Sequence, residues 1–312
     1  MNKNRLIGPV LLFLAALIWG ASFVAQDVGG VVGSFTFQAV RCFLGAVTLL
    51  IACVVKDVWQ KKKGTYRQAT SESRKMLLIG GIGCGLLLCT AVVLQQFGID
   101  ANVTSPGKDA FVTALYIVFV PVIALFFRRR SQPHVYLCVV VALMGLWLLC
   151  MNGMSITSGD TFVILCAVAF AFHITLVDFV APHVDGVKLS CLQFFVVAGV
   201  STVGMLIREQ PDMRLILDNW MPIVYSGVFS AAGGYTLQIL GQQRTQPTAA
   251  CLLMSLESVF AVISSMILLP EIPAPTAREW LGMAVIFAAI IFSQIPLRYG
   301  EKEISPQTGE EK

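Results

Sequence analysis

Long apolar stretches separated by short polar loops occupy almost the whole 312-residue chain. A helix that crosses a bilayer needs about 20 mainly apolar residues, because each residue adds about 1.5 Å. Ten stretches approach this length, in two sets of five: residues 8–25, 35–55, 76–97, 107–127 and 135–151, then residues 161–180, 189–207, 220–241, 248–269 and 280–296. The pattern predicts an all-α membrane protein with ten transmembrane helices.

Composition supports the same class of protein. Hydrophobic residues make up 56% of the chain, charged residues 13%, and the mean hydropathy is +0.78. A soluble domain carries about 25% charged residues. The longest polar loop is residues 56–75, which leaves no room for a soluble domain. The net charge of +4 gives no indication of nucleic-acid binding.

The basic residues are distributed unevenly between the two sides of the predicted membrane protein. Ten spans with the N-terminus inside place 17 lysines and arginines on one side and 3 on the other. Basic loops stay in the cytoplasm, so this bias predicts that both termini are cytoplasmic in the cell membrane. The first stretch is expected to be an uncleaved helix, since bulky Phe23 stands where a cleavage site needs a small residue.

Weak similarity between the halves indicates an internal repeat. Asp27 matches Asp178, Gln38 matches Gln193, and the proline at 106 matches that at 247. Five spans per half is an odd number, so the second half must be inverted in the membrane. Inverted repeats are typical of secondary transporters. We expect a first repeat at residues 1–155, a second at 156–300 and a cytoplasmic tail at 301–312.

Cysteine and histidine give no sign of metal or redox chemistry. All nine cysteines lie in predicted spans, where a disulfide framework is not expected, and the three histidines are scattered. Apolar packing accounts for the cysteines. We therefore expect no metal and no cofactor.

Small and amide residues recur at helical spacing in several spans. Ser34, Gln38, Arg41, Gly45 and Thr48 share one face of the second span. The third and eighth spans carry similar faces, formed by Gly81, Gly85, Cys89, Gln95 and Gln96, and by Gly227, Ala231, Gly234, Tyr235, Gln238 and Gln242. Two interpretations remain open at this point, which are close packing of helices and the lining of a cavity.

Few ionisable residues fall within the spans: Arg41, Lys108, Asp109, His173, Asp178 and Glu257. Such groups mark transport pathways or internal pairs. Each also has a structural interpretation: pairing for Arg41, snorkelling for Lys108, packing for His173 and a neutral hydrogen-bonded state for Glu257. Ser105 is expected to cap the fourth helix. The candidate substrate-binding residues are Trp19, Ser22, Gln38, Arg41, Gln95, Lys108, Tyr116, His173, Gln238 and Glu257.

Four sequence blocks resemble the EamA-type members of the drug/metabolite transporter superfamily: residues 18–23, residues 39–43, residues 95–116 and residues 256–271. Ser258 and Pro270 stand where that family usually has proline and glycine. The resemblance implies a cavity between the halves, lined by spans one to four and six to nine. It also implies transport of a small metabolite, commonly by export and often with proton coupling or exchange. Amino acids, nucleotide precursors, vitamins and organic cations are handled by relatives.

The leading hypothesis is a secondary transporter of an amino-acid-like or other small organic solute, and an organic-cation exporter and a metabolite exchanger remain open within this class. A membrane-embedded enzyme would need a nucleophile–base set or clustered metal ligands, and neither is found. A scaffold or sensor would be expected to carry a soluble output domain. The expected partners are a small-molecule substrate, the lipid bilayer and a coupled proton or counter-substrate, and a homodimer is compatible with the sequence.

Overall fold

The computed structural model describes residues 3–66, 68–101, 106–126, 133–150, 158–269, 274–293 and 295. These residues form helices and connecting turns, with no strand among them. The first half contains α1 (Lys3–Gly29), η1 (Gly30–Val32), α2 (Ser34–Lys62), α3 (Ser71–Ala101), α4 (Pro106–Thr113), α5 (Tyr116–Phe126) and α6 (Pro133–Cys150). The second contains α7 (Ser158–Val180), η2 (Ala181–His183), α8 (Gly186–Arg208), α9 (Met213–Asp218), α10 (Trp220–Val224), η3 (Tyr225–Gly234), α11 (Tyr235–Gln242), α12 (Pro247–Met254), α13 (Leu256–Leu268) and α14 (Ala277–Ser293).

Eight helical segments of the described chain are long and apolar enough to cross a bilayer. They are Leu6–Val32, Ser34–Lys62, Ser71–Ala101, Pro106–Phe126, Ser158–His183, Gly186–Arg208, Trp220–Gln242 and Pro247–Leu268. The fifth and tenth predicted spans correspond to α6 and α14, which have 18 and 17 residues. A 17-residue helix is about 26 Å long, slightly less than a typical hydrocarbon core. The prediction of a multi-pass helical membrane protein is confirmed.

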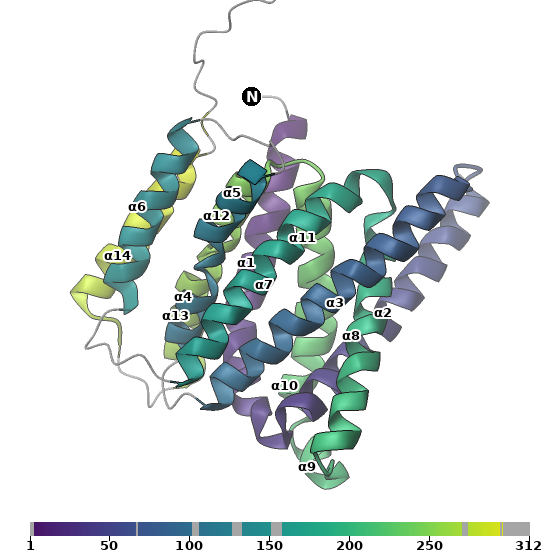
Figure 1. Cartoon of the computed structure of the whole chain (residues 1–312), viewed down its shortest axis with the longest axis horizontal. Helices are drawn as coiled ribbons and strands as arrows, with labels where there is room; N and C mark the ends of the chain where they lie inside the picture. Colours follow the sequence, from purple (N-terminus) through teal and green to yellow (C-terminus); the bar gives the residue numbers. More distant parts are fainter. Residues whose placement is uncertain are drawn as a thin grey trace, which may run out of the picture.

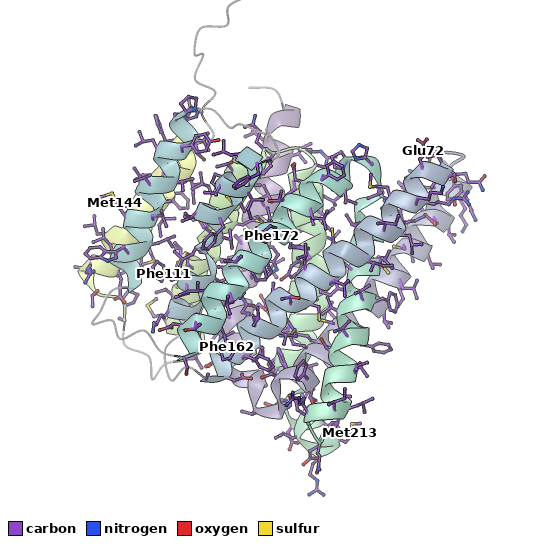
Figure 2. The ribbon with its side chains drawn as sticks, viewed as in Figure 1. Glu72, Phe111, Met144, Phe162, Phe172 and Met213 are labelled. Carbon is purple, nitrogen blue, oxygen red and sulfur yellow. The ribbon has the colours of Figure 1, made fainter. Side chains whose placement is uncertain are left out.

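The sides of the helix bundle are apolar (Figure 2). Phe172 is 47% exposed and Met144 is 61% exposed, and both lie on the sides of the bundle rather than at its ends. Exposed charge occurs at the ends of the helices, for example at Glu72 in the first turn of α3. A surface with so many exposed large apolar side chains is suited to lipid.

Successive long helices run in alternating directions (Figure 1). The start of α1, the end of α2 and the start of α3 lie at the same face of the bundle. The connection between α11 and α12 also reaches this face, since Gly8 near the start of α1 lies against Arg244 and Thr245. At the edge of the bundle α6 and α14 are antiparallel, with Arg278 stacked 4.8 Å from the Trp147 ring at one end and His134 against Phe292 at the other.

Three predicted spans are not the continuous helices that their apolar length suggested. The fourth is interrupted at Ala114 and Leu115, and the ninth at Ser255, in each case eight residues after the proline that begins the segment. At the first break the backbone hydrogen bonds join residues three apart instead of four, as in the bond from Ile117 N to Ala114 O at 3.0 Å. At the second, the Ser255 hydroxyl donates to Leu252 O at 2.7 Å, which satisfies a carbonyl near the break. The eighth span contains a wider π-helical segment, η3. Such irregular backbone occurs in membranes only where protein or a cavity surrounds it.

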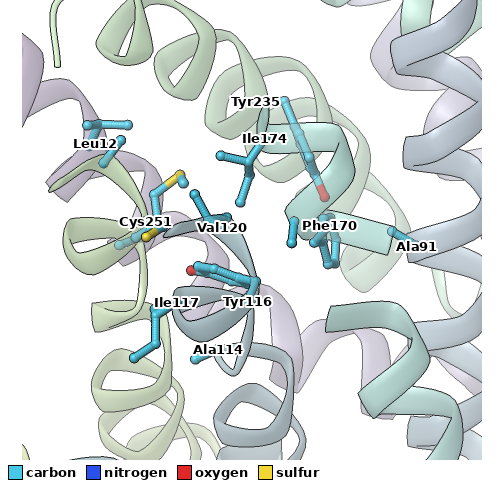
Figure 3. Close-up of a cluster of buried hydrophobic side chains, with 14 of the residues drawn as sticks. Leu12, Ala91, Ala114, Tyr116, Ile117, Val120, Phe170, Ile174, Tyr235 and Cys251 are labelled. Carbon is cyan, nitrogen blue, oxygen red and sulfur yellow. The ribbon is translucent and has the colours of Figure 1, made fainter. Parts of the chain in front are cut away.

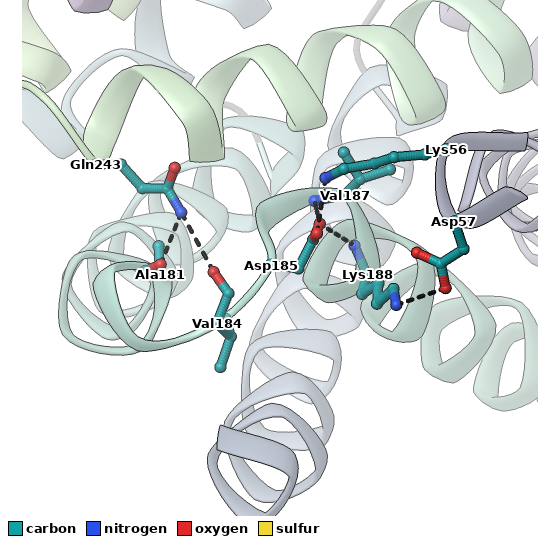
Figure 4. A network of polar contacts seen from close by, with 8 residues as sticks. All are labelled: Lys56, Asp57, Ala181, Val184, Asp185, Val187, Lys188 and Gln243. Carbon is teal, nitrogen blue, oxygen red and sulfur yellow. Dashed lines mark hydrogen bonds and ion pairs between the residues drawn. The ribbon is translucent and has the colours of Figure 1, made fainter. Parts of the chain in front are cut away.

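An ion-paired cluster joins the end of α2 to the start of α8 (Figure 4). Lys56 Nζ lies 2.6 Å from Asp185 Oδ2, and Lys188 Nζ lies 2.8 Å from Asp57 Oδ2. Asp185 also caps α8 by accepting from Val187 N at 3.0 Å. Burial alone would raise the pKa of Asp185, but Lys56 and the cap bonds hold it below its ordinary value. The opposite end of the same helix pair is also joined, because Glu209 after α8 accepts from Phe35 N and Thr36 N at the start of α2.

The small-residue faces serve mainly to bring helices close together. A Cβ at Gly45 would lie 2.9 Å from Gly227 O, and one at Gly227 would lie 2.7 Å from Arg41 O. Gly81 and Gly85 are similarly covered by side chains of α8. The sequence left open whether the small-residue faces pack helices or line a cavity, and these glycines serve helix packing.

Candidate functional site

A small closed cavity lies near the middle of the bundle, between the two halves of the chain. Its walls come from α1, α2, α3, α5, α7, η3, α11, α12 and α13: Trp19, Ser22, Phe23, Gln26, Arg41, Gln95, Tyr116, Phe170, Ile174, Ser230, Tyr235, Gln238, Met254 and Glu257. Its volume is about 30 Å³. This volume suffices for a water molecule or two, so the structure shows a closed form of the site.

Several polar atoms around the cavity are buried without a hydrogen-bond partner among the described residues. They are Trp19 Nε1, Ser22 Oγ, Gln26 Oε1, Tyr116 Oη, Gln238 Oε1 and Glu257 Oε1. Buried polar groups in proteins are almost always paired, and an unpaired one costs about 1–3 kcal/mol. Six such atoms around one cavity are therefore the feature expected of a site whose partners come from a ligand or from water.

Arg41 supplies the positive charge of the cavity. It lies on α2, is only 3% exposed, and its Nε donates to Gln38 Oε1 at 2.8 Å. Gln38 is in turn anchored by donating from Nε2 to Val92 O on α3 at 3.1 Å. The guanidinium carbon lies 5.5 Å from the centre of the Phe37 ring. Gln38 thus positions Arg41, while the terminal guanidinium nitrogens have no described hydrogen bond.

Glu257 supplies the acidic side chain of the cavity, from the first turn of α13 just after the Ser255 break. It is 4% exposed. Tyr116 interacts with it from the first turn of α5, just after the corresponding break in the fourth span. Each residue lies ten positions after the proline that begins its segment, so the two broken spans present Tyr116 and Glu257 at equivalent positions.

Aromatic rings form part of the cavity wall. The Trp19 and Tyr235 rings lie 4.8 Å apart between centroids, and Phe194 packs against Tyr235 at 5.2 Å. Figure 3 shows Tyr116, Phe170 and Tyr235 within the buried cluster around the cavity. The Trp19 indole packs closely against Gly234 of η3, where a Cβ would lie 2.6 Å from Nε1. This close approach is available because residue 234 is glycine.

Seven of the ten candidate residues from the sequence line this cavity: Trp19, Ser22, Arg41, Gln95, Tyr116, Gln238 and Glu257. Gln38 lies behind Arg41, as described above. His173 is also outside the lining. Its Nε2 is hydrogen-bonded to Gln193 Oε1 at 3.1 Å.

Lys108, eight residues before Tyr116 on the same predicted span, was a candidate substrate-binding residue but does not line the cavity. The interruption at Ala114 and Leu115 changes the helical register between them. Lys108 Nζ forms an ion pair with Asp160 Oδ2 at 2.9 Å, at the start of α7. That pair offsets the cost of a lysine near the positive end of α4. The expected cap at Ser105 lies outside the described residues.

The candidate list from the sequence omitted several residues of the wall, including Gln26, Phe170 and Ser230. It also omitted Tyr235, although that residue was placed on the face of the eighth span that could line a cavity. Gln26 and Ser230 were detectable as polar residues within apolar spans. Phe170 carries no signal that separates it from the other apolar residues of α7. No group of three or more metal-ligating side chains occurs in the described part of the chain.

The fold and the polar cavity define a multi-pass membrane protein with the form of a small-molecule transporter. The EamA-like transporter family matches residues 6–151 and again residues 157–294. Together these ranges cover most of the chain, which therefore belongs to the EamA-like transporter family.

Individual relatives are more distant. The chain is 24% identical to an uncharacterized transporter of Archaeoglobus fulgidus, over 92% of this chain and 86% of that protein. It is 25% identical to the threonine/homoserine exporter RhtA of Escherichia coli strain K12, over 94% of each chain. A solved crystal structure with 18% identity covers 92% of this chain and 96% of its own, with a TM-score of 0.71. The last likeness concerns the fold alone.

Proposed function

We propose that this protein is a secondary active transporter that exports a small amino-acid-like metabolite across the cytoplasmic membrane by alternating access. The observation that carries the proposal is the closed cavity between the halves, with six buried polar atoms that have no hydrogen-bond partner in the described part of the chain. A cavity of about 30 Å³ is smaller than any amino acid. Binding and release therefore require the halves to move, as alternating access does. The name of the relative RhtA supports the amino-acid class and the direction.

The helix contacts support two inverted five-helix repeats, at residues 1–155 and 156–300. Under this arrangement α1 corresponds to α7, α2 to α8, α3 to the segment from α10 to α11, α4–α5 to α12–α13 and α6 to α14. The contact of α3 with α7 then has its counterpart in α11 with α1, and that of α1 with α13 in α7 with α5. The pairs α2–α8 and α6–α14 are their own counterparts. Such pairing of contacts follows directly from a two-fold axis in the membrane plane.

A second cavity supports a route from the cytoplasmic side. Ile174 and Gln238 line the closed cavity, and Asp178 and Gln242, one helical turn further along α7 and α11, line a cavity of about 490 Å³. The second cavity includes the α11–α12 connection, at the same face as the start of α1. The Gln242 Nε2 bond to Ile174 O, at 3.0 Å, lies between the two cavities. We propose that separation of α7 from α11 here admits the substrate.

Counterflow in proteoliposomes tests the transport function. Liposomes that contain the purified protein and unlabelled threonine should accumulate labelled threonine from outside, and protein-free liposomes should not. Failure to exchange threonine, homoserine or any other neutral amino acid would contradict the amino-acid class. Failure with every small metabolite tried, in protein shown to be folded, would contradict transport itself.

The proposed topology predicts that both termini face the cytoplasm. Reporter fusions after Glu72 and Lys302 should report the cytoplasm, and a fusion after Asn152 should report the outside, because ten spans follow an inside N-terminus. The same result at all three positions, or the reverse assignment, would contradict the ten-span arrangement and the inverted repeat with it.

The position of Tyr116 relative to Lys108 predicts different labelling of cysteines at these two sites. In a cysteine-free background, Tyr116→Cys should react with a small polar thiol reagent, and bound substrate should slow the reaction. Lys108→Cys is the matched comparison on the same predicted span, and substrate should leave its labelling unchanged because Lys108 is paired with Asp160 outside the cavity. Protection of residue 108 and not of residue 116 would place the substrate elsewhere.

A further inference from the structure

We propose that the closed cavity binds the zwitterion of an α-amino acid, with its carboxylate at Arg41 and its ammonium at Glu257. This inference rests on the proposed transport function and assigns the two ends of the substrate to two named side chains. It concerns the charges of the cavity, which the comparisons with known proteins do not address.

The cavity contains one basic and one acidic side chain that are not paired with each other. Arg41 on α2 and Glu257 on α13 both line it, and no ion pair joins them in the part of the chain that the structure describes. Leaving two charges unpaired in the interior of a membrane protein is expensive. A ligand that carried one charge of each sign would satisfy both.

Arg41 and Glu257 each have hydrogen-bonding atoms available for a ligand. Gln38 holds Arg41 by Nε alone, which leaves the terminal nitrogens to form the two-pronged contact that a carboxylate accepts. Glu257 Oε1 has no hydrogen-bond partner among the described residues and can accept from an ammonium group. The Tyr116 hydroxyl lies beside Glu257 and also has no geometric hydrogen-bond partner among the described residues.

Organic cations and organic anions fit this cavity less well than a zwitterion does. An organic cation would find Glu257 and the aromatic wall favourable but would be repelled by Arg41. An organic anion would find Arg41 favourable and be repelled by Glu257. With Arg41 positive and Glu257 negative, the cavity has no net charge but has two separate charged groups. An amino acid zwitterion likewise has no net charge and carries a separate carboxylate and ammonium. The aromatic rings of Trp19 and Tyr235 line the same cavity and pack against each other at 4.8 Å.

Ligand-induced thermal stabilisation of the full-length protein in lipid nanodiscs tests the assignment. The probes are threonine, threoninol, which lacks the carboxylate, and N-acetylthreonine, which lacks the ammonium charge. The wild-type protein should bind threonine at least tenfold more tightly than either analogue. Arg41→Gln should weaken threonine binding at least tenfold and should not weaken threoninol binding, because a cation loses only a repulsive charge. Glu257→Gln should weaken threonine binding and should not weaken N-acetylthreonine binding, for the same reason with the signs reversed.

The crossed pattern separates charge recognition from a general effect on the cavity. Lys61→Gln and Glu72→Gln, which remove one exposed charge of each sign at the ends of the helices, are the matched controls and should change none of the three affinities. If Arg41→Gln does not yield folded protein, Arg41→Lys replaces it and should retain a reduced preference for threonine over threoninol.

Equal wild-type affinity for all three probes, or an equal loss for all three in either variant, would overturn the proposal. Tighter binding of threoninol than of threonine would overturn it in favour of an organic-cation site. The outcome is distinguishable from failure of the transport function. Counterflow of another solute without threonine binding would leave transport standing and overturn only the zwitterion, whereas charge-selective threonine binding without counterflow of any solute would contradict transport and retain the zwitterion.

Discussion

Glu257→Gln is expected to abolish accumulation of substrate driven by a pH gradient, while the protein remains folded and continues to exchange substrate. Glutamine keeps the shape of the side chain and most of its hydrogen bonding, but it cannot take up or release a proton. We propose that Glu257 is the group through which a proton gradient drives transport. The measurement is uptake of labelled threonine into proteoliposomes with and without an imposed pH gradient.

The physical reason lies in the surroundings of Glu257. Glu257 is 4% exposed in a membrane span, with Tyr116 beside it, and its Oε1 has no hydrogen-bond partner among the described residues. Ionisation at such a place is costly without a counter-charge. Arg41 lines the same cavity, but no ion pair joins it to Glu257 in the described part of the chain. A proton from one side and a substrate ammonium from the other could each neutralise it in turn, so that their movements would be linked.

Substrate must be supplied at saturating concentration, because the same change is expected to weaken binding of the ammonium group. Under that condition counterflow without a gradient should persist in Glu257→Gln, and the response to the gradient should disappear. Accumulation equal to that of the wild-type protein would exclude a proton role for Glu257. A variant that no longer folds would indicate a packing role, which is the structural interpretation of a buried acid.

The positions of the membrane-spanning helices were predictable from the length of the apolar stretches in the sequence. A chain that must satisfy its backbone within lipid has to form helices of bilayer length, so the runs of apolar residues locate the spans directly. The breaks in the fourth and ninth spans were not predictable in this way. Neither glycine nor proline occurs at residues 114, 115 or 255, and the interruptions depend on side-chain bonds such as Ser255 to Leu252 O and on packing between the halves.

The cavity was predictable as far as rare polar groups within spans mark it. Arg41, Gln95, Gln238 and Glu257 were found because each is costly to place in lipid. Lys108 was a candidate because it is an ionisable residue within a predicted span. It is paired instead with Asp160 in the other half of the chain, and sequence spacing carries no information about such a contact. Gln38 was a candidate because it shares a face of the second span with Arg41, and its position behind Arg41 depends on a bond to α3 that the sequence does not show.

Gly20→Ala is expected to destabilise the protein by about 1–3 kcal/mol, the usual cost of overpacking, and to reduce transport strongly. Gly20 lies where α1 crosses α13. A Cβ there would lie 2.7 Å from the carbonyl carbon of Phe260 and 2.8 Å from Ala261 N, so the helices would have to separate. That crossing sets the positions of Trp19 and Glu257 in the cavity, and thermal unfolding and counterflow measure the two effects.

Gly199→Ala is the matched control, because it makes the same change within α8, where a Cβ would have no atom within 4 Å. Alanine favours helix over glycine by about 1 kcal/mol, so helix propensity alone predicts stabilisation at both positions. Opposite signs at residues 20 and 199 would therefore isolate the contact between α1 and α13 as the cause. An unchanged unfolding temperature and full counterflow in Gly20→Ala would show that α1 and α13 can move apart without disturbing the cavity, which would contradict the close crossing as the feature that positions the site.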